Sequence, residues 1–584
     1  MEDFLLQVRK PSRYIGREWN VSRKDISLAE VKFALCFPDL YDVGMSNLGI
    51  RILYDILNKL PLVVCERFFS CAADLEAILR EKGMPITSLE SGKPLREFDI
   101  AGFSLGYELH YTNVLNMLQL GAVPLRSSER DESYPLIIGG GPGVLNPEPI
   151  HEFFDLFVIG EAEEVVVEIV ECYRAWKKTG AQKQELLIRL SHLEGVYVPA
   201  LYSVTYQESG AIQEFKPEYP GVPVRVKKRI IGDFNASAYP LDWLIPYIQI
   251  IHDRISLEVM RGCPNRCRFC QARVQYFPFR QRDAARAFEL ACELYRRTGY
   301  EEISLSGLSV SDYSGLEELL RSLVGEFQEN AVSVSLPSIK PKLILQQLSK
   351  LIVSIKKTGL TFAPEAGSEK LRRILAKDFD IDEFFQVLSE AYAHGYRHVK
   401  LYFMIGLPYE EKADLDGIIG LATRVSDLKR KFSPGPAQVN ISINPLIPKP
   451  HTPFQWFGMD TIIALKEKQD YIRSKAKNRR FKIDFHHTDM SFLEGVFSRG
   501  DRKLSAVVLK AFSKGARFDA WGEYFNLDTW MDAFRECGID PQFYLQKRSK
   551  DDILPWDFID MGVSKDFLKR EAEAVEQEWS AVNG

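Results

Sequence analysis

The sequence lacks the features of membrane-inserted and disulfide-stapled proteins. None of its apolar runs reaches the roughly 18 residues that cross a bilayer, and its first residues, MEDFLLQVRKPSRY, have no apolar core like that of a signal peptide. It contains nine cysteines, an odd number that argues against a complete set of disulfides. We therefore expect a cytoplasmic protein without membrane insertion, in which most cysteines are buried thiols.

A strong excess of one charge is also missing. The 584 residues include 75 basic and 80 acidic side chains, for a formal net charge of -5. Because the whole protein has no field that attracts nucleic acid or anionic lipid, any site for a polyanion has to be a local patch. Apolar residues, in contrast, make up 46% of the chain and aromatic residues 12%, which is enough for large cores in roughly three to four domains.

The first third of the chain alternates strand-like and helix-like segments. VKFALCFP (31–38), DIAGFSLG (99–106) and PLIIGGGP (135–142) are apolar stretches, each followed by an amphipathic segment. This pattern predicts an α/β fold with a Rossmann-like, doubly wound parallel sheet over residues 1–196, whose ligands bind at the carboxyl ends of the strands. Residues 197–250 are richer in Pro and Tyr, and we expect a small β elaboration and linker there.

A second alternation of strands and helices predicts a partial or full (β/α) TIM-type barrel over residues 251–456. In that architecture the active site lies at the carboxyl ends of the strands. Residues 457–584 have mainly helical patterns and are expected to form a separate C-terminal region. The strand-like segments of the barrel are ISLEVMRG (255–262), EEISLSGL (301–308), VSVSLPSI (332–339), GLTFAPEAG (359–367), HVKLYFMIGLP (398–408) and QVNISINPLIP (438–448).

Three cysteines, Cys263, Cys267 and Cys270, stand together in RGCPNRCRFCQAR, directly after the first predicted barrel strand. Three thiolates on one short loop can converge on a single soft metal centre. A structural zinc site would need a fourth ligand, usually from a second cysteine pair, and the sequence has no such pair. Zinc and unligated thiols remain the alternatives to a four-iron cluster that keeps one iron open.

The segment CPNRCRFC resembles the CxxxCxxC motif of radical S-adenosylmethionine (SAM) enzymes, including the aromatic Phe269 before the third cysteine. The resemblance implies that the three cysteines hold a [4Fe-4S] cluster whose open iron binds SAM. It also implies reductive cleavage of SAM to a 5′-deoxyadenosyl radical, so that the cofactor carries the chemistry. A reductant such as flavodoxin or ferredoxin would then be a partner.

Other strand ends resemble further parts of that family's cofactor site. Ser309 and Ser311 in SGLSVSDY stand where the family holds the amino group of SAM, although loop capping explains them equally well. Glu365 in FAPEAGSEKLRRIL is similar to an ExGSE element near the ribose hydroxyls, or else is a charge at a helix start. Gly406 in YFMIGLP resembles a GxP turn beside adenine. His451 in NPLIPKPHTPFQW could contact substrate or be a packed histidine.

The N-terminal segment resembles cobalamin-binding domains. PDLYDVG has the frame of their DxHxxG motif, with tyrosine in place of the histidine that ligates cobalt, and VIGEAEE looks like the GEGEE signature of radical enzymes with this domain. The resemblance implies a cobalamin-binding-like fold with cobalamin as a possible cofactor. The alternative is a vestigial Rossmann-like domain that serves substrate or interdomain contacts. The residues that would line a cobalamin site are Asp39, Tyr41, Gly44, Ser104, Gly140, Gly141 and Glu161.

Together these motifs resemble a bacterial subfamily of radical SAM enzymes with an N-terminal cobalamin-binding-like domain. The function implied is modification of an unactivated carbon, with cobalamin-dependent methylation as one form. An alternative is an RNA-modifying, methylthiotransferase-like enzyme, for which the basic segment YIRSKAKNRRFK (471–482) could meet phosphates, unless it is a solvated helix face. A second alternative is a non-catalytic iron–sulfur or cobalamin-fold sensor or binding module.

Overall fold

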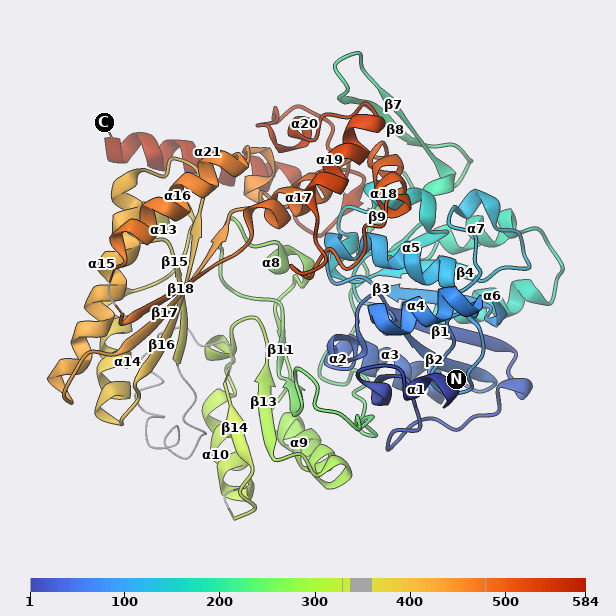
Figure 1. Cartoon of the computed structure of the whole chain (residues 1–584), viewed down its shortest axis with the longest axis horizontal. Coiled ribbons are helices and arrows are strands. Elements are labelled where there is room, and N and C mark those ends of the chain that lie inside the picture. Colours follow the sequence, from blue (N-terminus) through green and yellow to red (C-terminus); the bar gives the residue numbers. More distant parts are fainter. Residues whose placement is uncertain (1, 328, 337–359, 478, 584) are drawn as a thin grey trace. The chain divides into compact units, whose positions relative to one another are not determined.

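The computed structural model describes residues 2–327, 329–336, 360–477 and 479–583 (Figure 1). The chain groups into two compact units that are described separately here. The first unit consists of Met1–Asp253, Val496–Phe543 and Asp551–Gly562, and the second of Arg254–Gly495, Tyr544–Lys550 and Val563–Gly584. In the described part of the chain, every helix is too short or too polar to cross a bilayer.

The first unit is built on a six-stranded sheet with the strand order β2-β1-β3-β4-β5-β6. All neighbours pair in parallel except β6, which runs antiparallel to β5. The strands β1 and β2 are almost wholly buried, as expected for parallel strands that are covered on both faces. The strands are β1 (Val31–Phe37), β2 (Val63–Phe69), β3 (Ile100–Ser104), β4 (Leu136–Gly140), β5 (Leu156–Val158) and β6 (Val196–Tyr197).

Helices follow the strands of this sheet along the chain, and the order of its first five strands is that of flavodoxin-like doubly wound folds. In such a fold the ligand crevice lies between the carboxyl ends of β1 and β3, where the winding direction changes. The helices are α2 (Tyr41–Gly44), α3 (Leu48–Lys59), α4 (Ala73–Lys82), α5 (Tyr111–Leu120), α6 (Val165–Lys177) and α7 (Lys183–Ser191).

Later parts of the chain complete the first unit. The predicted β elaboration contains the hairpin of β7 (Tyr202–Tyr206) and β8 (Ile212–Pro217). Phe558, near the C-terminus, stacks on Phe215 of β8 with ring centroids 4.3 Å apart. The helices α18 (Leu504–Ser513) and α19 (Leu527–Glu536) and the pair of β9 (Val226–Lys227) with β19 (Ile559–Asp560) also belong here.

The second unit contains two parallel sheets, of order β10-β13-β14 and β15-β16-β17-β18. The strand expected at 332–339 begins as β14, and its last residues lie outside the described part of the chain. Within the described ranges the two sheets are not hydrogen-bonded to each other, so the closed barrel stays a prediction. The strands are β10 (Ile255–Glu258), β13 (Glu302–Ser306), β14 (Ser333–Ser335), β15 (Leu360–Glu365), β16 (His398–Ile405), β17 (Gln438–Pro445) and β18 (Phe481–Phe485).

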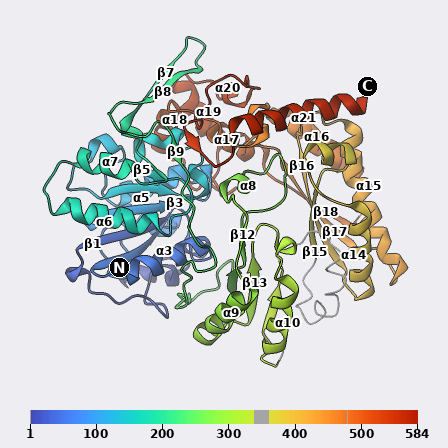
Figure 2. The same ribbon diagram turned by 180° about the vertical axis from the view of Figure 1, so that it is seen from behind.

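The helices of the second unit lie between these strands along the chain. They are α8 (Gln271–Gln275), α9 (Ala284–Thr298), α10 (Leu316–Phe327), α13 (Glu369–Ile374), α14 (Ile381–Ala393), α15 (Lys412–Leu428) and α16 (Ile462–Lys475). The last helix, α21 (Lys565–Asn583), also belongs to this unit (Figure 2). The predicted α/β class with parallel sheets is confirmed. The residues of the expected C-terminal region are shared between the two units, and the domain boundaries at 196, 250 and 456 stay a proposal.

Candidate functional site

The cysteine loop, residues 262–270, follows β10 and the short strand β11 (Met260–Arg261), which pairs with β12 (Arg280–Gln281). Gly262 opens the loop with φ +83°, in the left-handed region that favours glycine. A Cβ atom there would lie 2.7 Å from the carbonyl oxygens of Tyr276 and Pro278. The loop can therefore leave the sheet in this direction only with glycine at its start.

The thiols of the cysteine loop are free and half-buried. Burial is the main cause that raises the pKa of Cys267 to about 11, and it also raises the pKa of Cys270. The N–H of Cys270 donates to the Cys267 carbonyl at 3.3 Å, and both thiols interact electrostatically with Cys263. Even so, within the described residues no group of three or more Cys, His, Asp or Glu side chains is arranged to hold a metal ion.

The chemistry of this donor set fits a [4Fe-4S] cluster. Three soft thiol ligands on one loop satisfy three irons, and a metal drives off the thiol proton that burial otherwise retains. A closed zinc site would need a fourth ligand, and the structure brings no second cysteine pair to this loop in its described part. Cys263, Cys267 and Cys270 are thus the residues that would hold the cluster.

A short hydrogen-bond chain links the cysteine loop to the loop after β13. Asn265 Nδ2 donates to Cys263 Sγ at 3.2 Å and to Asp312 Oδ2 at 2.9 Å. Ser309 Oγ donates to the same Asp312 oxygen at 2.6 Å. Ser309 and Ser311 are both buried at this strand end. Hydrogen bonds to sulfur tune the potential of iron–sulfur clusters, and Asn265, which the sequence reading missed, is the donor here.

Glu365 ends β15 with φ +67°. Lys377 connects its carboxylate to the cysteine loop. The Lys377 ammonium lies 3.2 Å from Glu365 Oε1. Burial raises the pKa of Glu365, and Lys377 opposes that rise. Lys377 also interacts electrostatically with Cys267 and Cys270. A cation next to thiolates stabilises their negative charge. Because Lys377 belongs to no sequence motif, only the structure shows that it lies beside Glu365 and interacts with the cysteine loop.

Gly406 follows β16 with φ +77°, and a Cβ atom there would lie 3.1 Å from Leu465 and 3.3 Å from the Asp460 carboxylate. Its N–H donates to Glu410 Oε2 at 2.9 Å. Lys468 binds the same carboxylate at 2.6 Å. The turn thus needs glycine for its own backbone, and the role of Gly406 beside adenine stays a proposal.

Phe269 and His451 are packed side chains. Phe269 lies against an apolar cluster that includes Leu407 and Leu446, the residues next to the ends of β16 and β17. His451 is 6% exposed, and its backbone N–H donates to Gln455 Oε1 at 3.0 Å. Phe269 therefore joins the third cysteine of the loop to neighbouring strand ends, and the packed interpretation of His451 fits the structure.

At the carboxyl ends of β1 and β3, the predicted cobalamin residues bind groups of the chain itself. Asp39 is 4% exposed, accepts a hydrogen bond from Trp521 Nε1 at 2.9 Å, and lies 3.4 Å from His110 Nε2. The Tyr41 hydroxyl donates to Glu18 Oε1 at 2.8 Å, and burial raises the pKa of Tyr41. Tyr41, which stands where the cobalamin motif has its cobalt ligand, is thus fixed by a buried hydrogen bond.

The remaining residues predicted to line a cobalamin site determine the course of the backbone or bind it. A Cβ atom at Gly44 would lie 2.3 Å from the Phe69 ring, and Gly141 has φ +98° with its Cβ position 2.6 Å from the Leu105 carbonyl oxygen. Glu161 Oε2 accepts from the N–H of Ile231 at 2.7 Å. Ser104 and Gly140 are paired residues at the ends of β3 and β4.

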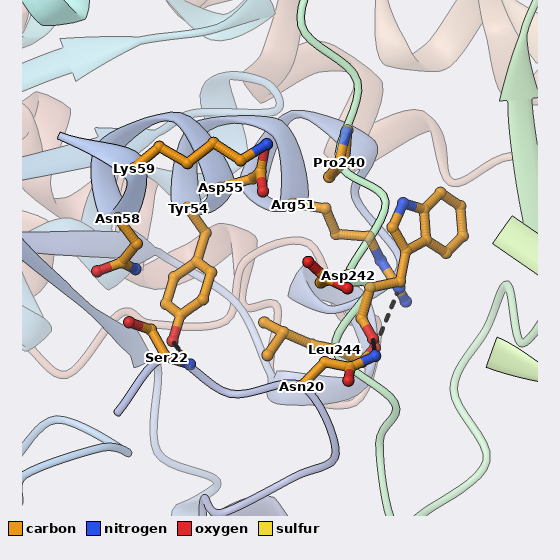
Figure 3. A pocket seen from close by; sticks show the side chains of 11 residues that line it. Asn20, Ser22, Arg51, Tyr54, Asp55, Asn58, Lys59, Pro240, Asp242 and Leu244 are labelled. Atoms are coloured by element: carbon orange, nitrogen blue, oxygen red, sulfur yellow. Dashed lines mark hydrogen bonds and ion pairs between the residues drawn. The ribbon is translucent and has the colours of Figure 1, made fainter. Parts of the chain in front are cut away.

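A separate cavity of about 200 Å³ lies in the first unit (Figure 3). Asp55 and Lys59 form an ion pair of 2.7 Å on its wall, and Arg51 donates to the Leu244 carbonyl. None of the residues predicted for a cofactor lines it. Its lining residues are Asn20, Ser22, Arg51, Tyr54, Asp55, Asn58, Lys59, Pro240, Asp242, Trp243 and Leu244.

Two family models match the chain. The model of the N-terminal part of radical SAM proteins matches residues 49–199. The model of the radical SAM superfamily matches residues 257–422, which include the cysteine loop, Glu365 and Gly406. An uncharacterized protein of Methanocaldococcus jannaschii is 27% identical over 516 residues, covering 87% of this chain and 97% of that protein.

Other likenesses are more limited. The tRNA-2-methylthio-N(6)-dimethylallyladenosine synthase of Chlorobium phaeobacteroides is 28% identical over 145 residues, which are 23% of this chain and 31% of that protein. The radical SAM methyltransferase TsrM of Kitasatospora setae has 12% identity and a TM-score of 0.45, covering 70% of this chain and 72% of its own. The cobalamin-dependent enzyme OxsB has 14% identity and a TM-score of 0.45, covering 95% and 80%. Scores this low do not define a shared fold.

Proposed function

The chain belongs to the radical SAM superfamily of enzymes, and we propose that it binds a [4Fe-4S] cluster and SAM and modifies an unactivated carbon of its substrate. When bound, these cofactors supply reductive cleavage of SAM and a 5′-deoxyadenosyl radical. The observation that carries the proposal is the cysteine loop, which offers three thiols and no fourth just after the parallel strand β10 and the short strand β11.

The residues around the loop have distinct roles in this proposal. Lys377, which interacts electrostatically with Cys267 and Cys270, would offset their negative charge once they hold the cluster. Asn265, held by Asp312, donates to Cys263. These groups orient the ligands and set the local charge, which is the protein's share of the work in a cofactor enzyme.

Glu365 is the proposed acceptor for the ribose hydroxyls of SAM. Its Oε1 binds Lys377, and in the described part of the chain its Oε2 accepts no hydrogen bond. A carboxylate can accept both hydroxyls of a diol. Burial raises the pKa of Glu365, and the neighbouring Lys377 opposes that rise and so favours the ionised carboxylate.

Cobalamin is a possible further cofactor, with methylation as the reaction it would serve. As they stand, the residues expected to line it do not fit a corrinoid. Tyr41 is bound to Glu18, Asp39 to Trp521, and Glu161 to the backbone of Ile231. The proposal therefore routes no step through cobalamin.

RNA modification is a less favoured variant. The short match to a tRNA-modifying synthase supports it, but three of the six cations of the basic segment are already paired with acidic side chains. Arg473 pairs with Asp470, Lys475 with Asp416, and Arg480 with Asp427. These pairs favour a solvated basic surface. The expected helix face is wrong beyond Lys475, where α16 ends, because β18 begins at Phe481.

Anaerobic reconstitution tests the proposal. The wild-type chain should take up about four iron atoms, and SAM should change the electron paramagnetic resonance (EPR) spectrum of the reduced cluster. Cys267→Ala should lose both properties, whereas Cys537→Ala, a partly exposed cysteine outside the loop, should keep them. A wild-type chain that takes up no iron, or a Cys267→Ala variant that behaves like wild type, would refute the cluster.

A further inference from the structure

Arg268, between the second and third cysteines, is a buried and multiply hydrogen-bonded residue of the cysteine loop. Its side chain is 6% exposed. The guanidinium donates through Nε to Glu571 Oε2 at 3.0 Å and through both Nη atoms to Glu578 at 3.1 Å. Both carboxylates belong to α21, about 300 residues further along the chain.

The same side chain also ties the loop to α13. Arg268 Nη1 donates to the carbonyl of Ile374 at 2.9 Å, at the end of that helix, where carbonyls lack helical partners. The backbone N–H of Arg268 donates to the Leu375 carbonyl at 2.9 Å. Lys377 lies just beyond. One guanidinium therefore joins the cysteine loop, the segment that carries Lys377, and α21.

Apolar side chains of α21 also pack near the cysteine loop. Val575 and Trp579 belong to the cluster against which Phe269 packs. Trp579 stacks on Tyr409, in the turn after β16, with ring centroids 4.8 Å apart and planes 9° apart. Lys370 of α13 places its ammonium 5.0 Å from the Trp579 ring.

We propose that α21 is the positioning element of the cysteine loop and that Arg268 is the residue through which it acts. This inference rests on the proposed function, because α21 is proposed to position the loop for holding a cluster. Glu571 and Glu578 lie about two helical turns apart on one face, so a rigid helix presents both carboxylates to one planar donor. Arginine suits this task because its donors form a fixed fork.

Amide hydrogen exchange in the metal-free chain tests the positioning directly. In the variant Glu571→Gln/Glu578→Gln, the amides of residues 262–275 should exchange at least about tenfold faster, since two charge-assisted contacts are lost. The matched control is Glu573→Gln, a glutamate of the same helix that is 49% exposed and pairs with Lys550. It should leave exchange in the loop unchanged.

A second measurement uses the reconstituted protein. Iron release to a chelator should be about tenfold faster in Arg268→Ala, and the EPR spectrum of the reduced cluster should change. Arg268→Lys keeps the charge without the fork and should rescue partly. Adding Glu571→Gln and Glu578→Gln to Arg268→Ala should increase the rate of iron release only slightly, because the two carboxylates act on the loop through Arg268.

The inference is overturned if loop exchange in the double glutamine variant stays within twofold of wild type, or if Glu573→Gln has the same effect. These outcomes are distinct from failure of the proposed function. A wild-type chain that binds no iron would refute the cluster, whereas the exchange experiment on metal-free protein would still decide whether α21 holds the loop.

Discussion

Replacing Glu365 by glutamine should weaken SAM binding with little change in shape. The substitution keeps the length of the side chain and an oxygen for Lys377, but it removes the charge. In the structure, Lys377 binds only Oε1, at 3.2 Å, so the second oxygen is available to the ribose. A hydrogen bond to a charged group contributes about 1.5–3 kcal/mol. The expected loss in SAM affinity is therefore roughly 10- to 150-fold.

The assay is equilibrium binding of SAM to anaerobically reconstituted protein. The control is Glu369→Gln, which removes the same charge four residues later from a side chain that is 69% exposed and pairs with Arg373. That variant should bind SAM like wild type. An affinity of Glu365→Gln within twofold of wild type, in a variant that takes up iron normally, would refute the assigned role of the carboxylate.

Three further predictions concern the first unit. Trp521→Ala leaves the buried Asp39 carboxylate without its indole donor and should lower the free energy of unfolding by about 1–3 kcal/mol in denaturant titration; an unchanged free energy of unfolding would contradict a stabilising role for this hydrogen bond. Gly141→Ala should lower the free energy of unfolding by about 2 kcal/mol or more in denaturant titration, because φ is +98° and the Leu105 carbonyl is too close; a loss below about 0.5 kcal/mol would count against that strain. Burial lowers the pKa of His151 from 6.5 to about 4, so the stability it contributes is present above pH 6.5 and is lost as the pH falls toward 4. His151→Gln should flatten that acid loss in chemical denaturation at several pH values, and an equally steep loss would argue against His151.

Local patterns predicted much of this architecture. The apolar run at 31–38 became the buried parallel strand β1, as expected for a strand covered on both faces. The run at 398–408 gave β16, in which buried residues alternate with more exposed ones. The cysteine motif predicted a site just after a strand, and the cysteine loop does follow β10 and β11. The strand β18 was missed because its first two residues belong to the basic segment 471–482, which was interpreted as a helix face. The alternation of apolar and charged residues in FKIDF is in fact the pattern of a half-buried strand.

Contacts between distant residues could not be predicted in this way. Trp521 reaches Asp39 across 482 positions, and Glu578 reaches Arg268 across 310. Such pairs leave no periodicity in a single sequence. The same holds for Lys377, whose importance comes from its place beside Glu365 and two thiols. The partners of the cobalamin-like motif were equally invisible in the sequence, as the bond from Tyr41 to Glu18 shows; a role for these residues in binding cobalamin stays a prediction.

Formation of 5′-deoxyadenosine tests the central claim most directly. The reconstituted wild-type protein, supplied with SAM and a strong reductant under anaerobic conditions, should release 5′-deoxyadenosine and methionine in equal amounts, detected by mass spectrometry. Cys267→Ala should release neither. Absence of both products from a wild-type protein that carries its iron, or equal yields from the two proteins, would contradict the account.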